Sequence, residues 1–275
     1  MQALFTLTSS ESKRLIGKAV AALPEVQHAK DHGYLVIGRG STNAFILEEL
    51  LNEKMEKEKY VAGQIIKGVL CVLGPGLRAR PVCFHKGEIL AVEPGTLVDK
   101  LTPGDILIKG ANAVDPFGNV GVVMAGAGGG TMGQFYMALK AQGVETLYAV
   151  GLEKLIPSVE EAALYGGKMA LERSIGCRVG MACVADGRIV TEIEAIDSLF
   201  GLTAVHYCSG GWGGSEGAVT LIVEGEDDEV NRCMNVIEGI KGEPPLPVAK
   251  GPCKGCGAPC SFDGKEMGEL PTYLR

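Results

Sequence analysis

The sequence has no long apolar segment of the kind that crosses a membrane. No run of 18 apolar residues occurs in its 275 positions, whereas a membrane-spanning helix needs about 20. The first residues, Met1 to Ser12, also lack the charged start and apolar stretch of a secretory signal peptide. We therefore expect a cytoplasmic protein that has no membrane partner.

Dense clusters of basic residues are also missing. The chain has 26 Lys and Arg residues against 33 Asp and Glu residues, which gives a net charge of −7. Proteins that bind nucleic acid need clustered positive charge to contact phosphates, so we expect no nucleic-acid partner. We find no internal repeat, and the length suits one large domain or two modest ones. Homodimers are common among such proteins, so a homodimer is an open expectation.

Nine cysteines are too few and too scattered for a disulfide scaffold. Three of them, Cys253, Cys256 and Cys260, crowd into a C-x2-C-x3-C segment rich in glycine and proline. Short spacings of this kind let thiolates converge on a zinc ion or an iron–sulfur cluster. A fourth ligand would come from Cys208, from Cys233, from a neighbouring chain or from an exogenous group. Unligated thiols or a disulfide pair are the alternative.

The apolar pattern alternates between strands and helices over residues 1–175. Helical spacing from Leu15 to Leu23, behind the possible caps Ser9 and Ser10, predicts a first helix. Such alternation is typical of a parallel, layered α/β domain. Further strands are expected at 34–37, 69–73, 89–92, 106–108, 120–124 and 146–151, and further helices from about 45, at 132–141 and at 158–174 with Ser158 as cap.

A second pattern follows over residues 176–242. Strands at 188–193, 203–208 and 218–223 with helices at 196–201 and 228–240 predict a small α+β domain, plausibly ferredoxin-like. The loop around Trp212 is expected to connect two strands of a hairpin, and a flexible lid that carries an aromatic wall is the alternative. The remaining residues, 243–275, form a tail rich in Pro, Gly and Cys that has too little periodicity to fold by itself.

Glycine is abundant, with 40 residues or about 15% of the chain, roughly twice its usual share. Two glycine loops, 38–43 and 126–133, each precede a predicted helix, where backbone N–H groups bind anions. If both strands before them lie in one parallel sheet, the loops meet at its carboxyl edge. A tight turn without a ligand is the alternative. The expected ligand-binding residues are Gly38, Gly40, Ser41, Thr42, Asn43, Gly128, Gly129 and Gly130.

These motifs resemble those of a known superfamily. Gly38-Arg-Gly-Ser-Thr42, the segment 105–119 and the run 126–130 are similar in order and spacing to the G-x-G-S-T, D-G-A-D-E and K-G-G-G motifs of ribose-5-phosphate isomerases. The stretch 150–162 resembles one in lactate-utilisation (LUD) domains. The resemblance spans roughly residues 30–165. It implies an isomerase/CoA-transferase-like variant of the Rossmann fold, in which the first loop binds a sugar phosphate.

The chain departs from the isomerase pattern at the reacting groups. Lys109 and Asn112 stand where the isomerases carry acidic residues, and Gln134 replaces the carboxylate base on the following helix. Proton abstraction beside a carbonyl needs a positioned base, so we do not expect ribose-5-phosphate isomerase activity. We predict instead the binding of a small anionic metabolite: a sugar phosphate, an organic acid or an acyl-CoA.

Three residues are candidates for catalysis, although turnover itself is left open. Lys109 would offset negative charge, Asn112 would donate an amide hydrogen bond, and Glu153 belongs to the Glu-Lys pair that the LUD domains also carry. The alternatives are a solvated lysine, a turn-capping asparagine and a surface ion pair. Asp115, followed by proline, is expected to start a turn. Two other functions remain open: a zinc or iron–sulfur accessory or redox protein acting through the cysteine tail, and a metabolite sensor without turnover.

Overall fold

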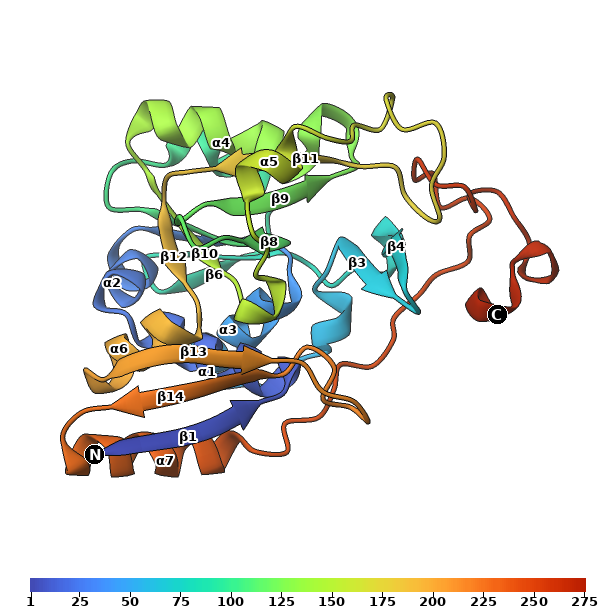
Figure 1. Ribbon diagram of the computed structural model, residues 1–275. Helices are drawn as coiled ribbons and strands as arrows, with labels where there is room; N and C mark the ends of the chain where they lie inside the picture. Colours follow the sequence, from blue (N-terminus) through green and yellow to red (C-terminus); the bar gives the residue numbers. More distant parts are fainter.

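A six-stranded sheet forms the centre of the protein (Figure 1). The computed structural model describes all residues, 1–275. The strand order is β12-β10-β7-β2-β5-β6. The first four strands run parallel to one another, β5 pairs antiparallel with β2, and β6 pairs antiparallel with β5. The fold is therefore α/β as predicted, with a mixed rather than a purely parallel sheet. The strands are β2 (Tyr34–Ile37), β5 (Val82–His85), β6 (Glu88–Leu90), β7 (Ile106–Gly110), β10 (Glu145–Ala149) and β12 (Arg188–Val190).

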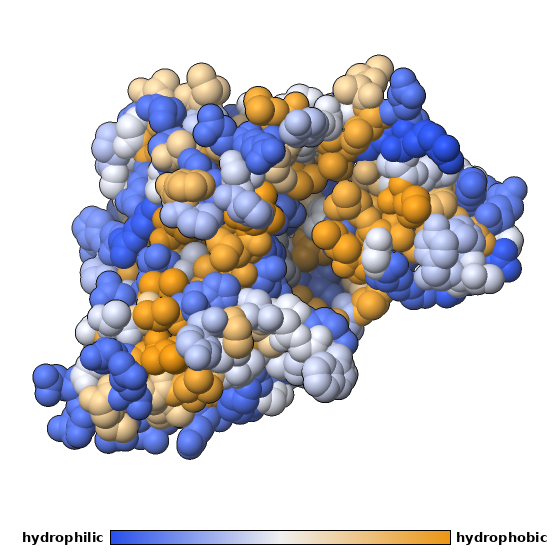
Figure 2. Space-filling view, viewed as in Figure 1, coloured by the Kyte–Doolittle hydropathy of each residue, from blue (hydrophilic) through white to orange (hydrophobic).

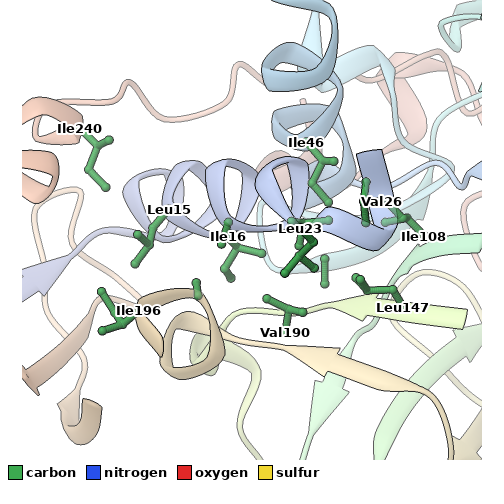
Figure 3. Close-up of a cluster of buried hydrophobic side chains, with 14 of the residues drawn as sticks. Leu15, Ile16, Leu23, Val26, Ile46, Ile108, Leu147, Val190, Ile196 and Ile240 are labelled. Carbon is green, nitrogen blue, oxygen red and sulfur yellow. The ribbon is translucent and has the colours of Figure 1, made fainter. Parts of the chain in front are cut away.

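Helices cover both faces of this sheet. One face packs on α1 (Ser9–Ala22), α2 (Pro24–His32) and α3 (Ser41–Leu51), and the other packs on α4 (Gly130–Gln142) and the 3-10 helix η3 (Pro94–Lys100). Strands buried on both faces consist of nearly continuous apolar residues, which explains the short apolar runs in the sequence. Figure 3 shows the first of these cores, where side chains of α1 and α3 meet those of β7, β10 and β12.

Several helix ends differ from the prediction. Helix α6 (Glu192–Phe200) begins four residues before the predicted 196, because Thr191 caps it, and the strand predicted to reach 193 ends at Val190. Helix α1 is capped by Thr8, not by Ser9 or Ser10: the Thr8 backbone N–H donates to Glu11 Oε2 over 2.8 Å, and the Glu11 N–H donates to the Thr8 hydroxyl. Helix α5 (Val159–Ala163) is capped by Ser158 as predicted, but the extension to residue 174 is wrong. The chain turns away at Gly166 and Gly167, whose φ angles are +92° and +108°.

A second, antiparallel sheet has the order β1-β14-β13 and packs on α6 (Glu192–Phe200) and α7 (Asp227–Ile240). Its strands are β1 (Gln2–Leu7), β13 (Thr203–Ser209) and β14 (Val219–Glu224). The loop with Trp212 joins β13 to β14, which confirms the predicted hairpin. Strand β1 comes from the start of the chain and β12 belongs to the main sheet, so backbone pairing crosses the predicted boundary at residue 175. The division into 1–175, 176–242 and 243–275 stays a prediction.

Two small sheets and the tail complete the fold. The strands β11 (Gly180–Val184), β9 (Val120–Met124) and β8 (Ala113–Val114) pack beside α4, while β3 (Gly63–Ile66) and β4 (Val69–Val72) form a projecting hairpin. Beyond residue 242 the chain has no strand or α-helix, and it returns to lie beside this hairpin (Figure 1). None of the helices is both long and apolar enough to cross a membrane. The remaining 3-10 helices are Lys57–Lys59, Pro75–Leu77, Ala127–Gly129, Leu152–Lys154, Met267–Glu269 and Thr272–Leu274.

Candidate functional site

A cleft of about 860 Å3 separates the body of the protein from the lobe formed by the β3–β4 hairpin and the tail. Figure 2 shows this hollow with apolar residues along its walls. The first glycine loop, the end of β7, the second glycine loop and the hairpin all contribute to its lining. The volume falls in the range of small-molecule sites in proteins.

The first glycine loop joins β2 to α3 and is held by backbone hydrogen bonds. The Gly38 N–H donates to the Ile108 carbonyl over 2.8 Å, and the Gly40 N–H donates to the Tyr60 carbonyl over 2.9 Å. Asn43 is fully buried behind the loop, where its amide donates to the Gly38 carbonyl over 2.7 Å. Asn43 therefore positions the loop and does not line the cleft. The predicted residues that do line it here are Gly38, Gly40, Ser41 and Thr42.

The N-terminus of α3 faces the cleft without a side-chain cap. The first N–H groups of a helix have no acceptor within the helix. They carry the positive end of the helix dipole and are suited to bind an anion.

The second glycine loop leads into α4, whose N-terminus is also uncapped. Gly128, Gly129 and Gly130 have φ angles of +61°, +79° and +58°, a region that favours glycine. Gly129 and Gly130 line the cleft with Thr131, while Gly128 is exposed outside it. At Gly133 the backbone of α4 touches the loop, since a Cβ there would lie 1.6 Å from the Gly128 carbonyl oxygen.

We expected both loops to follow strands of one parallel sheet, and this expectation is wrong. The first follows β2 of the main sheet, whereas the second follows β9, which pairs antiparallel with β8 and β11. Both loops nevertheless line the same cleft. Periodicity alone identified β9 as a buried strand, but it did not indicate its partners.

Basic side chains dominate the charge of the cleft. Four of them line it, with Glu93 as the one carboxylate. Glu93 is itself 3.6 Å from Arg39 Nη2. This positive lining belongs to a chain whose net charge is −7. The four basic residues are Arg39, Arg78, Lys109 and Lys154.

Lys109 and Lys154 are poorly solvated lysines. Burial lowers the pKa of Lys109, at the end of β7, to about 8. Burial, together with the nearby charge of Lys13, lowers the pKa of Lys154 to about 8, and its Nζ donates to the Ala111 carbonyl over 2.9 Å. A desolvated ammonium group is stabilised by a nearby negative charge, so both lysines favour an anion in the cleft.

The other two predicted catalytic residues have different surroundings. Asn112 lines the cleft, and its Oδ1 accepts a hydrogen bond from the Val123 N–H over 3.0 Å, so its NH2 group is the end left to donate to a ligand. Glu153 does not line the cleft but pairs with Lys13 Nζ over 2.6 Å. Although burial opposes its ionisation, Lys13 and Lys154 hold the pKa of Glu153 below its usual value. The pair of Glu153 and Lys13 is enclosed by the protein rather than exposed at the surface.

Asp115 organises a turn, as its sequence context indicates. Its carboxylate accepts hydrogen bonds from the N–H groups of Phe117 and Asn119, over 3.0 and 2.9 Å, and from Val159 over 2.9 Å. These bonds fasten the turn to the start of α5. Asp115 does not line the cleft.

The three tail cysteines line a smaller cavity of about 20 Å3. Neither suggested fourth ligand reaches it, because Cys208 is exposed on β13 and Cys233 lies on the buried face of α7. Two other cysteines, Cys71 and Cys177, line it instead. No three His, Cys, Asp or Glu side chains are already arranged as a metal-ligand set.

Sequence reasoning missed several residues that line the cleft. Arg39 lies inside the first glycine motif and Lys154 follows Glu153, so both were adjacent to predicted residues. Arg78, Cys71 and Cys177 come from segments that carry no motif of their own, and only the fold brings them to the cleft. No family model and no curated protein matches the chain.

Proposed function

We propose that the protein binds a small anionic metabolite in the cleft between its two glycine loops. The observation that carries this proposal is the charge of the lining: four basic side chains against one carboxylate, in a protein of net negative charge. Two uncapped helix N-termini face the same cleft and add positive potential. A phosphate, a carboxylate or a thioester-derived oxyanion is the chemistry that these features suit.

The ligand class follows from the size and walls of the cleft. At about 860 Å3 the cleft exceeds what a lone phosphate fills, and its walls include Val122, Met124 and Val179. A sugar phosphate, an organic acid or an acyl-CoA would place its anionic group near the loops and its remainder along these walls. The arrangement of two glycine loops around an α/β sheet supports an isomerase/CoA-transferase-like variant of the Rossmann fold as part of this proposal.

The proposal is one of binding, and it excludes classical sugar-phosphate isomerisation. Gln134 lines the cleft on α4, where an isomerase would need a carboxylate base. Lys109 and Lys154, with pKa values of about 8, are able to exchange a proton near neutral pH. We propose them as the groups for any proton transfer at this site.

Isothermal titration calorimetry tests the proposal directly. The wild type is titrated with ribose 5-phosphate, acetyl-CoA and lactate, one from each ligand class. We expect measurable binding of at least one of them, and a loss of about tenfold or more in affinity in Lys109→Met, equivalent to about 1.4 kcal/mol. The control Lys100→Met removes the same charge from an exposed position outside the cleft. Absence of binding by all three ligands, or equal losses in both variants, would contradict the proposal.

A further inference from the structure

Five of the nine cysteines line one small cavity. Cys71 comes from β4, Cys177 from the segment before β11, and the other three from the tail. The remaining lining is apolar except for Lys250. The tail and the hairpin thus place five cysteines around the same cavity, although almost 190 positions of sequence separate Cys71 from Cys260.

Backbone hydrogen bonds fix two of these thiols opposite each other. Cys177 and Cys260 form an antiparallel bridge. On either side of it, the Arg178 N–H donates to the Pro259 carbonyl over 2.8 Å and the Ser261 N–H donates to the Gly176 carbonyl over 3.3 Å. The two cysteines are therefore a non-hydrogen-bonded pair, the closest kind of cross-strand neighbour.

A tight turn brings the other two tail cysteines together. The Cys256 N–H donates to the Cys253 carbonyl over 3.2 Å, and the Gly264 N–H donates to the same carbonyl over 3.1 Å. Gly255 and Gly257 have φ angles of +73° and +66°, so glycine permits the turn. The turn therefore places both Cys253 and Cys256 in the lining of the cavity.

The tail has little else to hold it in place. It forms no strand or α-helix, and the apolar cluster it shares with the hairpin contains only Val69, Phe262, Leu270 and Leu274 as buried members. Small segments with so little apolar burial commonly depend on a metal ion for their folding energy. The thiols supply ligands of the kind that such an ion requires.

We propose that Cys71, Cys177, Cys253, Cys256 and Cys260 provide the ligands of a centre for a soft, thiolate-binding metal in the wall of the cleft. Four thiolates complete a tetrahedral zinc site, and a cavity of about 20 Å3 has room for a single ion. An iron–sulfur cluster uses the same ligands but needs the hairpin and tail to move apart. Because no three ligands are yet grouped, binding requires the thiols to rotate about their Cα–Cβ bonds towards the cavity.

The position of this centre links the tail to the ligand site. Cys71 and Cys177 line the large cleft as well as the small cavity. A metal held there would fasten the tail to the wall of the cleft. The metal proposal does not depend on the proposed anion binding, since its test measures metal content alone.

Metal analysis of the full chain after anaerobic purification tests the proposal. We expect about one zinc per chain, or iron accompanied by acid-labile sulfide, and either result supports the thiolate centre. Five thiols surround the cavity and four complete a zinc site, so the double variant Cys177→Ser/Cys256→Ser, which leaves three, should lose most of the metal. Cys183→Ser, on the neighbouring strand β11 but outside the cavity, should keep it.

A second measurement keeps the test valid if the variants fold poorly. Removing the metal from wild-type protein with a chelator should release the tail, so that trypsin cleaves faster at Lys250 and Lys254 while the body of the protein resists. Readdition of the metal should restore the resistance. The proposal is overturned if wild-type protein contains no metal and takes up neither zinc nor iron with sulfide. A native Cys177–Cys260 disulfide, detected by mass spectrometry after thiol blocking, would overturn it as well.

Discussion

Lys109 combines two properties that oppose each other. Its ammonium group lies at the end of β7 in the cleft, where burial lowers the pKa to about 8. The same desolvation that makes the group attractive to an anion makes it costly in the empty protein. Ligand binding and stability should therefore respond to this lysine in opposite directions.

Anion affinity should fall as the pH rises through about 8. Lys109 and Lys154 are charged below this pH and neutral above it, so the attraction for the ligand is lost as they deprotonate. Calorimetric titrations at intervals from about pH 6.5 to 9.5 measure the profile. Lys109→Arg keeps its charge over this range, so it should flatten the decline, whereas Lys100→Arg should leave it unchanged. A wild-type affinity that is constant across this range would contradict the prediction.

The empty protein should become more stable when Lys109 is replaced by Met. Because the folded-state pKa lies below the usual lysine value of 10.5, the unfolded chain binds more protons between about pH 8 and 10.5, and the free energy of unfolding rises with pH in that window. At pH 7 we expect Lys109→Met to gain about 2 kcal/mol, and the gain to shrink towards pH 10.5. Urea denaturation at both pH values measures it. Equal stability of the variant and wild type at pH 7 would refute this reading.

The second glycine loop depends on close contact with α4. Gly133→Ala would place a Cβ 1.6 Å from the Gly128 carbonyl oxygen, so the loop must move. We expect this variant to lose about 1–3 kcal/mol of stability and at least tenfold in ligand affinity. Gly126→Ala is the matched control, because Gly126 has a φ of −66° and a Cβ there would lie 3.7 Å from its nearest neighbour. Similar thermal unfolding and calorimetry for the two variants would show that the contact is unimportant.

Elements with a strong local pattern were predictable from the sequence, and their pairing was not. The apolar run before Gly38 and the helix after it are encoded within a few residues, as are the Ser158 cap and the Asp115 turn. The chain turns away after α5 at Gly166 and Gly167. The apolar periodicity of the sequence does not reveal how these glycines change the backbone direction. Pairing of β1 with β14 joins positions more than 200 apart. The antiparallel pairing of β9 with β11 likewise depends on contacts between distant segments, which a local pattern does not show.

The residues of the candidate site also divide into those that a local motif predicts and those that only the fold brings together. Glycine motifs marked the loops, and Lys109 and Asn112 marked the adjacent strand end, because each lies within one short segment. Cys71 and Cys177 could not be assigned to the cavity from spacing, because they reach it through the fold alone. Arg78 is a further example, since it lines the cleft without belonging to any motif.

At the scale of the whole molecule, Arg14 connects segments that are distant in sequence. From α1 its guanidinium bonds to Glu48 and Glu49 on α3 and to Glu243 at the start of the tail, the last over 2.9 Å. Its Cζ atom also lies 4.7 Å from the centre of the Phe45 ring. Burial alone would favour a neutral Glu48, but Arg14 and Lys57 hold its pKa at about 2.

Arg14→Met should therefore destabilise the whole protein by about 3 kcal/mol at pH 7, because it leaves buried Glu48 with Lys57 as its main partner. This loss of stability should become smaller in acid. Glu48 contributes stability above its usual pKa of 4.5 and loses it as the pH falls towards 2, so the gap between variant and wild type should narrow over that range. Urea denaturation at pH 7 and about pH 3 measures both. Lys18→Met breaks only the half-exposed contact with Glu49 and should cost under about 1 kcal/mol. A gap that stays constant in acid would show that the Arg14 network does not depend on the charge of Glu48.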